Sequence, residues 1–437
     1  MLRINSISRD ILDAKDIRVG GGNDKVVLRA NSEGESDVSI TRQDIVATGR
    51  MVALEYIGGQ INQNKLAIEK YNSLLADSGM TYSEASRFHK ERKLLYCAAM
   101  ACKQTGATPP RTFEEFKRDN MTYAMDEVFM RTMASIDREI LAPIYYDVVA
   151  DGTAGLIQWE EVGFGSTKEI DMLSNDVFFF EDVSWGSSRS VSKNYLYAKT
   201  ITLNPQPIAC NATIKWYQNA VAGDAGSYYA AIMRGLYSKV FARTMKTLNA
   251  AIENNTTNGY IPSGLISDTY TTANWLRIRD LVAASNGVSV NNGLMAIGTS
   301  SALANLLPVD GKGGAMTGLQ YGLGEAWFYN GYLPKAAGVD LFPVTPAIVP
   351  GTQNSTLDAI DTGDNIYILA KGLYRPLVGA RYEGTPITLT ATPSGGNGYA
   401  QGTADFTIDI NVTATLDIQP VFASKVGVIT SVYPTGD

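Results

Sequence analysis

The stretch that decides the fold is a strand that leads into a long helix. The strand reads Ile208-Ala-Cys-Asn-Ala-Thr-Ile-Lys-Trp216, and the helix opens with Asp224-Ala-Gly-Ser-Tyr-Tyr-Ala-Ala-Ile-Met-Arg-Gly-Leu-Tyr-Ser-Lys-Val-Phe241. Apolar side chains alternate with others from Ile208 to Trp216, and this period of two predicts a strand with one covered face. We interpret it as the return limb of a β-ribbon over residues 155–221. Its tip or bend is predicted at Trp185-Gly-Ser-Ser188.

The helix carries apolar residues that recur every four positions. They are Tyr228/Tyr229, Ile232/Met233, Leu236/Tyr237, Val240/Phe241, Met245, Leu248 and Ile252. Because an α-helix repeats every 3.6 residues, this stripe turns around a helix of about thirty residues and about 45 Å. A turning stripe cannot be buried against one neighbour, so we expect several elements to cross the helix. A projecting ribbon that leads into such a helix suits a protein that engages other copies, and it is not the usual build of an active site.

The first third of the chain is predicted to be an arm followed by helices. Residues 1–40 are interpreted as an arm with little structure of its own. Three helices then begin at capping-box patterns, which are Thr41…Asp44, Thr81…Glu84 and Thr112…Glu115. They are expected to end near Ala76, near Gly106 and at Pro143, because proline breaks a helix interior.

The last third mixes helix and strand. The pattern of residues 273–307 predicts a helix, a strand and a second helix. The pattern of residues 365–429 predicts mostly strands. Together with the helical region, this pattern predicts an α+β fold.

Composition excludes several classes of protein. The chain has 437 residues, a net charge of −7 and 45% apolar residues. No apolar run reaches the length of a membrane span, and the N-terminus has no signal-peptide core. Three cysteines are an odd count, which argues against a disulfide framework and favours a cytoplasmic origin.

The charge is unevenly distributed along the chain. There are 41 charged side chains in residues 1–150 and only 40 in residues 151–437. Depletion of charge is typical of buried interface cores, and β-rich segments also carry few charges. The negative net charge gives no reason to expect that the protein binds nucleic acid.

Chemically reactive motifs are absent. His89 lies between Arg87 and Lys90 and has no second ligand at metal spacing, so we expect a solvated helix residue. Cys97 and Cys102 are expected to pack in a core. The segment Gly163-Phe-Gly-Ser-Thr-Lys168 lacks phosphate-loop spacing, and Gly311-Lys-Gly-Gly314 is expected to be a loop. We therefore expect no enzyme and no catalytic, cofactor-binding or metal-binding residue.

Several segments in the same order resemble a known family, the tailed-bacteriophage major capsid proteins of the Hong Kong 97-like fold. The segments are Tyr197-Ala-Lys-Thr-Ile-Thr-Leu203, Gly259-Tyr-Ile-Pro-Ser-Gly-Leu265, Leu294-Met-Ala-Ile-Gly-Thr-Ser300, Gly331-Tyr-Leu-Pro334, Asp364-Asn-Ile-Tyr-Ile-Leu369, Ala404-Asp-Phe-Thr-Ile408 and Val421-Phe-Ala-Ser-Lys-Val-Gly-Val428. The resemblance covers residues 151–437. The helical region 41–142 is larger than the family's usual arm, and it is either a retained scaffold-like segment or an extra domain that clasps neighbours.

The resemblance implies a division of the chain. The parts are an N-terminal arm (1–40), a helical N-terminal region (41–150), an extended loop or β-ribbon (151–222), the spine helix of the peripheral domain (223–262), a mainly axial domain (263–362), and a C-terminal β-belt of the peripheral domain with an axial-domain return (363–437).

The resemblance also implies a function. Copies would form hexamers and pentamers of an icosahedral or prolate shell that encloses double-stranded DNA without sequence-specific binding. Portal, scaffold and decoration proteins are the implied partners, and no membrane is involved. The shell would be made in the host bacterial cytoplasm and located in the virion. The alternatives are an encapsulin-like bacterial nanocompartment shell and a soluble enzyme with a dispersed site.

Some members of the family join their subunits by a Lys–Asn isopeptide bond. The formal candidate lysine is Lys168, and asparagines are available at Asn365, Asn397 and Asn411, with Glu383 as the nearest acid in an apolar stretch. None of these asparagines has a family-like signature around it. We therefore expect Lys168 to be a solvated ribbon lysine and the shell to be non-covalent.

Overall fold

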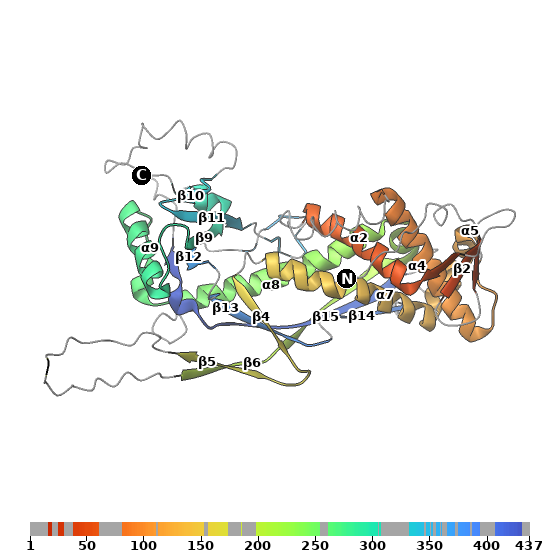
Figure 1. The fold of residues 1–437 in the computed structure, drawn as a ribbon. Helices are drawn as coiled ribbons and strands as arrows, with labels where there is room; N and C mark the ends of the chain where they lie inside the picture. The colour runs from red at the N-terminus through yellow and green to blue at the C-terminus, as the bar shows by residue number, and fades with distance from the viewer. Residues whose placement is uncertain are drawn as a thin grey trace. The chain divides into compact units, whose positions relative to one another are not determined.

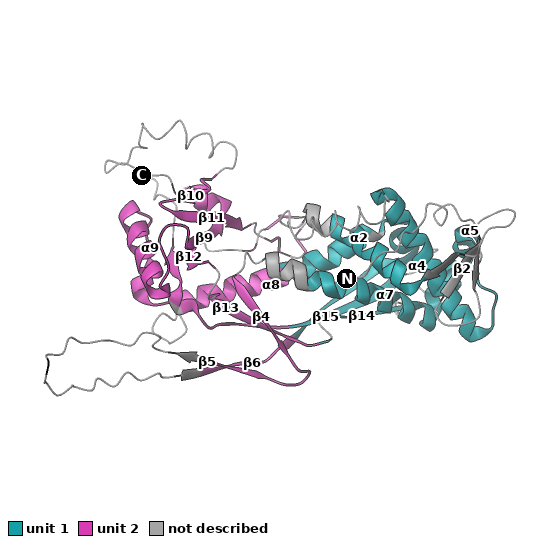
Figure 2. Ribbon diagram, viewed as in Figure 1, with its two compact units in different colours: residues 1–152, 207–237, 384–415 teal, residues 153–206, 238–383, 416–437 magenta. Residues whose placement is uncertain are grey.

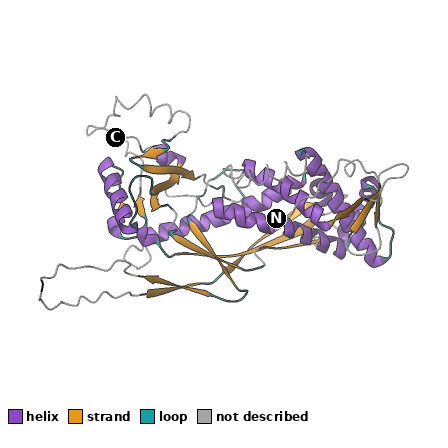
Figure 3. Cartoon of the chain, in the orientation of Figure 1, coloured by secondary structure: helices purple, strands orange, loops and turns teal. Residues whose placement is uncertain are grey.

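The chain contains both helices and strands throughout (Figures 1 and 3). The computed structural model describes residues 16–19, 25–29, 38–60, 81–110, 112–152, 156–173, 185, 198–253, 261–304, 306, 332–344, 347–349, 351–352, 355–358, 360, 365–371, 375–384, 387–393 and 407–430. They divide into two compact units (Figure 2). Unit 1 comprises residues 1–152, 207–237 and 384–415, and unit 2 comprises residues 153–206, 238–383 and 416–437. Each unit holds helices and strands, so the predicted α+β class is confirmed.

Strands lie within the segment that the sequence analysis treated as an unstructured arm. They are β1 Asp16–Val19, β2 Lys25–Arg29 and β3 Val38–Thr41, in an antiparallel sheet of that order. The expectation of little structure is therefore wrong for these three described segments. Local sequence gave no warning, because antiparallel pairing between short strands stabilises them only once the turns bring them together.

The helices of unit 1 begin where the capping patterns placed them. They are α2 Arg42–Gln60, α4 Tyr82–Thr105, α5 Phe113–Arg118, α6 Asn120–Met125 and α7 Glu127–Gly152. The Thr81 and Glu84 side chains each accept a hydrogen bond from the other residue's backbone N–H, which completes a capping box. The end predicted near Ala76 lies outside the described residues. The third predicted helix, which was expected to run from Thr112 to Pro143 without a break, is divided into three helices, α5 to α7.

Pro143 lies inside α7 and does not end it, contrary to the sequence-based expectation. Proline cannot donate to the carbonyl four residues before it, here that of Glu139. Arg50 of α2 supplies the missing donor, since its Nε and Nη2 donate hydrogen bonds to the backbone carbonyl oxygen of Glu139 at 3.3 and 2.9 Å. Helix α7 therefore continues because another helix satisfies the carbonyl that proline leaves open.

Gly49 explains how α2 can pack so closely. A Cβ atom at this position would lie 2.4 Å from Cδ1 of Ile140 and 2.6 Å from Cε1 of His89. The glycine is therefore required by the contact of α2 with α4 and α7, although it lowers the helix propensity of α2.

Strands β7 Gln206–Lys215, β14 Ile387–Pro393 and β15 Thr407–Pro420 lie beside these helices. In unit 1, β15 pairs with β14 and with β7, and α7 packs on β14. The alternate residues Ile408, Ile410, Val412 and Ala414 of β15 are buried. Strand β7 differs, because none of its residues is buried. The prediction that one face of this strand is covered is therefore wrong for the single chain.

A π-helical segment, η1 Trp216–Ala222, joins β7 to the long helix α8 Ala225–Glu253. The long helix is confirmed. Most of its stripe is buried, at Tyr229, Met233, Leu236, Tyr237, Val240, Phe241, Met245 and Leu248, whereas Tyr228, Ile232 and Ile252 are half-buried. The first part of α8 belongs to unit 1 and the rest, from Ser238, to unit 2. One helix therefore contributes side chains to both cores.

Unit 2 contains a six-stranded sheet in the order β10-β11-β9-β12-β16-β8. The bounds are β8 Ile266–Ser267, β9 Leu294–Thr299, β10 Lys335–Ala336, β11 Val339–Val344, β12 Ile366–Ala370 and β16 Gly427–Ile429. The helical segments are η2 Ser263–Leu265, α9 Thr272–Asn286, α10 Ser300–Ala304 and η3 Ala423–Lys425. The predicted helix–strand–helix is confirmed as α9, β9 and α10. Gly427 permits α9 to approach β16, because a Cβ atom there would lie 2.3 Å from Cγ2 of Ile278.

The remaining strands of unit 2 form the base of the ribbon. Strand β13 Leu377–Tyr382 pairs in parallel with β4 Ile157–Val162 and antiparallel with the end of β15. Strands β5 Lys168–Leu173 and β6 Ala198–Leu203 pair with each other alone among the described strands. An apolar cluster holds this base together, formed by Val162, Leu203, Val378, Ala380 and Val421. Of the predicted ribbon, the described residues contain the pair β5 and β6.

The centre of α8 gives a test of its burial. Val240 has no exposed surface, so Val240→Asp places an unpaired carboxylate in a core at a cost of several kcal/mol. We expect the variant to accumulate as insoluble protein. The matched control is Lys239→Asp, one residue away and exposed, which should be soluble with a near-normal melting temperature. Equal solubility and equal thermal melting of the two variants would refute the buried position of Val240.

Candidate functional site

A cluster of four buried polar side chains connects three helices of unit 1. Lys93 of α4 donates from Nζ to Oδ1 of Asp137 on α7 at 2.8 Å. The hydroxyl of Tyr229 on α8 donates to the same carboxylate oxygen at 2.7 Å and accepts from Lys93 at 3.2 Å. His89 completes the cluster, with its Nε2 at 2.9 Å from the Tyr229 hydroxyl oxygen. All four side chains are buried.

The position of His89 corrects the sequence analysis, which expected a solvated residue. Its relative exposure is 0%, and its Nδ1 lies 3.1 Å from the carbonyl oxygen of Ile45. Because a carbonyl only accepts hydrogen bonds, Nδ1 carries the proton, and the unprotonated Nε2 shares the single Tyr229 hydroxyl proton with the Asp137 carboxylate. Burial, and next the positive charge of Lys93, lower the pKa of His89 to about 3, so the imidazole is neutral.

The cluster has a structural role, because its groups cannot reach a substrate from the interior. Burial and the Asp137 carboxylate also raise the pKa of the Tyr229 hydroxyl, which stays protonated. A buried ion pair requires hydrogen bonds to offset its desolvation, and the tyrosine supplies one to the carboxylate. We conclude that these contacts fix α4, α7 and the start of α8 relative to one another.

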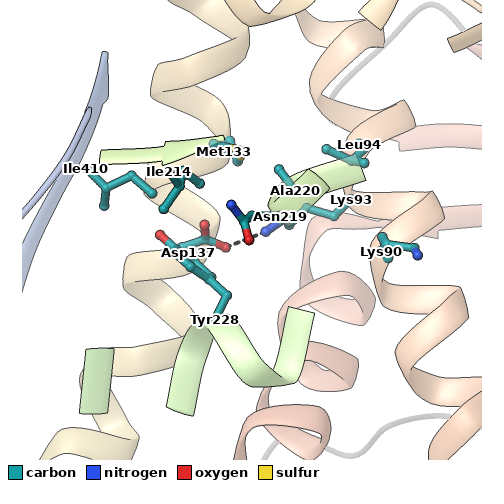
Figure 4. A pocket seen from close by; sticks show the side chains of 10 residues that line it. All are labelled: Lys90, Lys93, Leu94, Met133, Asp137, Ile214, Asn219, Ala220, Tyr228 and Ile410. Atoms are coloured by element: carbon teal, nitrogen blue, oxygen red, sulfur yellow. Dashed lines mark hydrogen bonds and ion pairs between the residues drawn. The ribbon is translucent and has the colours of Figure 1, made fainter. Parts of the chain in front are cut away.

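A small cavity lies beside this cluster (Figure 4), where the dashed line marks the Lys93–Asp137 ion pair. Its lining consists of Lys90, Lys93, Leu94, Met133, Asp137, Ile214, Asn219, Ala220, Tyr228 and Ile410. The volume is about 30 Å³, which suits a water molecule, whereas small-molecule sites measure about 300–1,000 Å³. The cavity is therefore too small for a substrate or cofactor.

One face of α4 also fixes the junction between the ribbon limb and α8. Tyr82 and Ser86 donate hydrogen bonds to the Asp224 carboxylate at 3.2 and 2.5 Å. Lys90, one turn further on, donates to the carbonyl oxygen of Gly223 at 3.3 Å. Three residues spaced by four thus hold the residues that precede α8. The helical N-terminal region is therefore an integral part of unit 1.

Lys168 of β5 pairs with Glu160 of β4 at 2.5 Å, and this contact lowers the pKa of the Glu160 carboxyl. The Lys168 side chain is still 40% exposed, so it is a solvated ribbon lysine that also has an ion-pair partner. Asn365 is buried, and its amide donates to Asn249 and to the Tyr367 hydroxyl, both at 3.4 Å.

The other positions considered for a covalent bond lie on different elements of the chain. Asn411 is exposed on β15 in unit 1, and Glu383 is exposed after β13. Asn397 lies outside the described residues.

The remaining sequence motifs are structural where they are described. Cys97 and Cys102 are buried, as predicted, and burial raises the pKa of Cys97 to about 12. In the segment 163–168 a turn, closed by the Ser166 N–H on the Gly163 oxygen, leads into β5. The segment 311–314 lies outside the described residues. In the part of the chain that the structure describes, no group of acids, histidines and cysteines could hold a metal ion. No helix within that part is long and apolar enough to cross a membrane.

Comparison with known proteins finds similarity to solved structures. No protein-family model matches it, and no curated protein matches its sequence. The mature capsid of bacteriophage PhiM1 matches with a TM-score of 0.39 and 12% identity, over 64% of this chain and 87% of the other. The capsid of cyanophage P-SCSP1u gives a TM-score of 0.38 and 10% identity, over 63% and 86%.

An encapsulin is also similar. The SrpI encapsulin of Synechococcus elongatus gives a TM-score of 0.36 and 12% identity, over 65% of this chain and 89% of the other. Phage capsids and an encapsulin are thus among the solved structures that match. Since every quoted TM-score is below 0.4, the proposal below rests on the elements of this chain.

His89 makes the stability of unit 1 depend on pH. Its pKa of about 3 in the folded chain lies below the 6.5 of an ordinary histidine, so only the unfolded chain takes up a proton between these values. The free energy of unfolding should therefore fall as the pH drops from 6.5 towards 3, by about 3 kcal/mol between pH 7 and pH 4 from this residue.

Denaturant unfolding at several pH values measures this dependence. The control is His89→Gln, which keeps an N–H donor for the Ile45 carbonyl and does not titrate. The wild type should lose more stability than the variant over the same pH range. Parallel pH profiles of the two proteins would show that His89 does not contribute.

Proposed function

We propose that this chain is a major capsid protein that assembles into the hexamers and pentamers of an icosahedral or prolate shell around double-stranded DNA. The observation that carries the proposal is the β5–β6 ribbon, whose strands pair only with each other among the described strands, while its base is packed in unit 2. A two-stranded ribbon is marginally stable alone. A ribbon of this kind is therefore suited to contacts with a neighbouring copy.

The order of elements supports the same proposal. The ribbon returns through β7 into α8, and the α9–β9–α10 segment and the long strand β15 follow. In the family that the sequence resembles, these correspond to the extended loop, the spine helix, the axial domain and the β-belt. The division of the chain given in the sequence analysis, from the arm (1–40) to the β-belt (363–437), is part of this proposal.

The exposed aromatic residues of unit 2 also suit contacts between copies. Trp185, in the segment between β5 and β6, is fully exposed, and Phe164, in the turn before β5, is 81% exposed. Large aromatic side chains are enriched at the energetic centres of protein interfaces. Portal, scaffold and decoration proteins are the further partners that the proposal includes.

Shortening the ribbon tests the proposal. Leu173 and Ala198 are register partners, so replacing residues 174–197 by Asn-Gly closes the hairpin with a two-residue turn. We expect this variant to fold, with the melting temperature of the wild type, and to form no closed particles in electron micrographs. A second variant with a Gly/Ser segment of the original length should fail in the same way. Closed particles of normal size from the shortened variant would contradict the proposed role of the ribbon.

The contents of wild-type particles separate a viral shell from a nanocompartment. Particles made together with DNA-packaging partners should enclose double-stranded DNA, whereas a nanocompartment shell encloses cargo proteins. An absorbance ratio typical of nucleic acid supports the viral shell. Particles that take up protein cargo and no DNA would favour the alternative.

The joints between subunits should be non-covalent, because Lys168 is engaged with Glu160 within its own chain. Denaturing gel electrophoresis of particles should give a single band near 47.2 kDa. A ladder of multimers that survives boiling and reductant would show that covalent bonds form.

A further inference from the structure

Two Asn–Gly dipeptides lie among the described residues of unit 2, and the fold accounts for both. Asn286–Gly287 ends α9, and Asn292–Gly293 closes the turn that leads into β9 (Figure 1). Gly287 and Asn292 have φ angles of 64° and 67°, in the left-handed region that glycine and asparagine tolerate best. A Cβ atom at Gly293 would lie 2.3 Å from the Ser289 carbonyl oxygen, so only glycine fits there.

An Asn–Gly dipeptide is chemically reactive without an enzyme. The backbone nitrogen of the glycine attacks the asparagine Cγ and forms a C–N bond. The side-chain nitrogen leaves as ammonia together with the glycine N–H proton, and a succinimide ring remains. Water then opens the ring at either carbonyl, which gives aspartate or isoaspartate. Ring closure is fastest where the glycine N–H is free and where a cation stabilises the negative charge that develops on the asparagine Oδ1.

The surroundings of Asn292 meet both conditions. The side chain is exposed, and its Oδ1 accepts a hydrogen bond from Nζ of Lys335 at 2.9 Å. This lysine is held in place by the Asp340 carboxylate, whose Oδ1 lies 3.0 Å from the same Nζ. Among the described residues, none accepts a hydrogen bond from the Gly293 N–H. The attacking nitrogen is therefore unengaged, and the amide that it attacks is polarised by a positive charge.

The surroundings of Asn286 are the opposite. The Gly287 N–H donates to two carbonyl oxygens in the last turn of α9. The Asn286 Nδ2 donates to the carbonyl oxygens of Val282 at 2.9 Å and of Lys425 at 3.0 Å. The attacking nitrogen and the side-chain amide are thus both held by hydrogen bonds, which must break before a ring can close.

We propose that Asn292 is a site of spontaneous deamidation through the Gly293 nitrogen, and that Lys335 accelerates the ring closure. The aspartate product places a carboxylate beside Lys335, where it competes with Asp340 for the ammonium group. The isoaspartate product adds an atom to the main chain immediately before β9, which lies between β11 and β12 in the six-stranded sheet. This inference concerns the single chain and does not depend on the proposed shell function.

Ageing of the purified wild-type protein at mildly alkaline pH tests the proposal, with Asn286 as the control within the same chain. Tandem mass spectrometry of proteolytic peptides gives the deamidated fraction of each asparagine over time. In the native protein, Asn292 should react faster than Asn286 on the order of tenfold or more, because only Asn286 must first break hydrogen bonds. In denaturant the two should react at similar rates. Equal native rates, a faster reaction at Asn286 or no reaction at Asn292 would overturn the inference.

A matched pair of substitutions tests the part of Lys335. Lys335→Met removes the donor to Asn292, and Lys335→Arg keeps a positively charged donor. The Lys335 side chain is 56% exposed, and Asp340 retains its ion pair with Lys371 in both variants, so both should melt like the wild type. Lys335→Met should slow the native reaction at Asn292 several-fold and leave Asn286 unchanged, whereas Lys335→Arg should react nearly like the wild type. An unchanged rate at Asn292 in Lys335→Met, or equal slowing in both variants, would overturn the assigned role of the lysine.

Discussion

The rest of the structure depends on how α8 buries its apolar stripe. The stripe turns around the helix, so no single layer of neighbours can cover it. Unit 1 buries Tyr229 and Met233 near the start of the helix, and unit 2 buries Val240 and Leu248 further on. The two cores are therefore built on one continuous helix. Its start is fixed by hydrogen bonds from α4 to Asp224, next to the segment that leads back to the ribbon.

The helices of unit 1 hold several buried polar groups that have specific partners. Arg50 satisfies the carbonyl that Pro143 leaves open, and Lys93, Asp137 and Tyr229 satisfy one another. Interactions of this kind add little net stability, since desolvation offsets most of their attraction. They do penalise any other arrangement of the helices, because displaced partners would remain buried and unpaired. This explains how the helices of unit 1 adopt one defined arrangement.

Elements governed by local periodicity could be predicted from the sequence, and elements governed by distant partners could not. The stripe of α8 and the capping boxes at Thr41 and Thr81 are local, and the structure contains them. The continuation of α7 past Pro143 depends on Arg50, which is 89 residues from its acceptor Glu139. Strand β13 lies within the segment 365–429 that was predicted to be mostly strands, but its residues Leu377–Ala380 are all buried and show no alternation, so its own bounds could not be predicted.

The candidate site also could be predicted from the sequence only in part. The charges beside His89 suggested solvent, yet Ala85, Phe88, Arg92 and Tyr96 follow helical spacing around it and are buried. That spacing was a signal available in the sequence, and it favoured a buried histidine. The exposure of β7 could not be predicted, because alternation identifies an apolar face and does not show whether other residues of the chain cover it.

The central claim is that this protein functions as a repeated subunit of a shell. Sedimentation velocity of the purified wild-type protein over a range of concentrations tests it most directly, because it measures the mass of every species without a label. The account predicts capsomers and closed particles whose masses are large multiples of 47.2 kDa. A single species of 47.2 kDa at every concentration would contradict it.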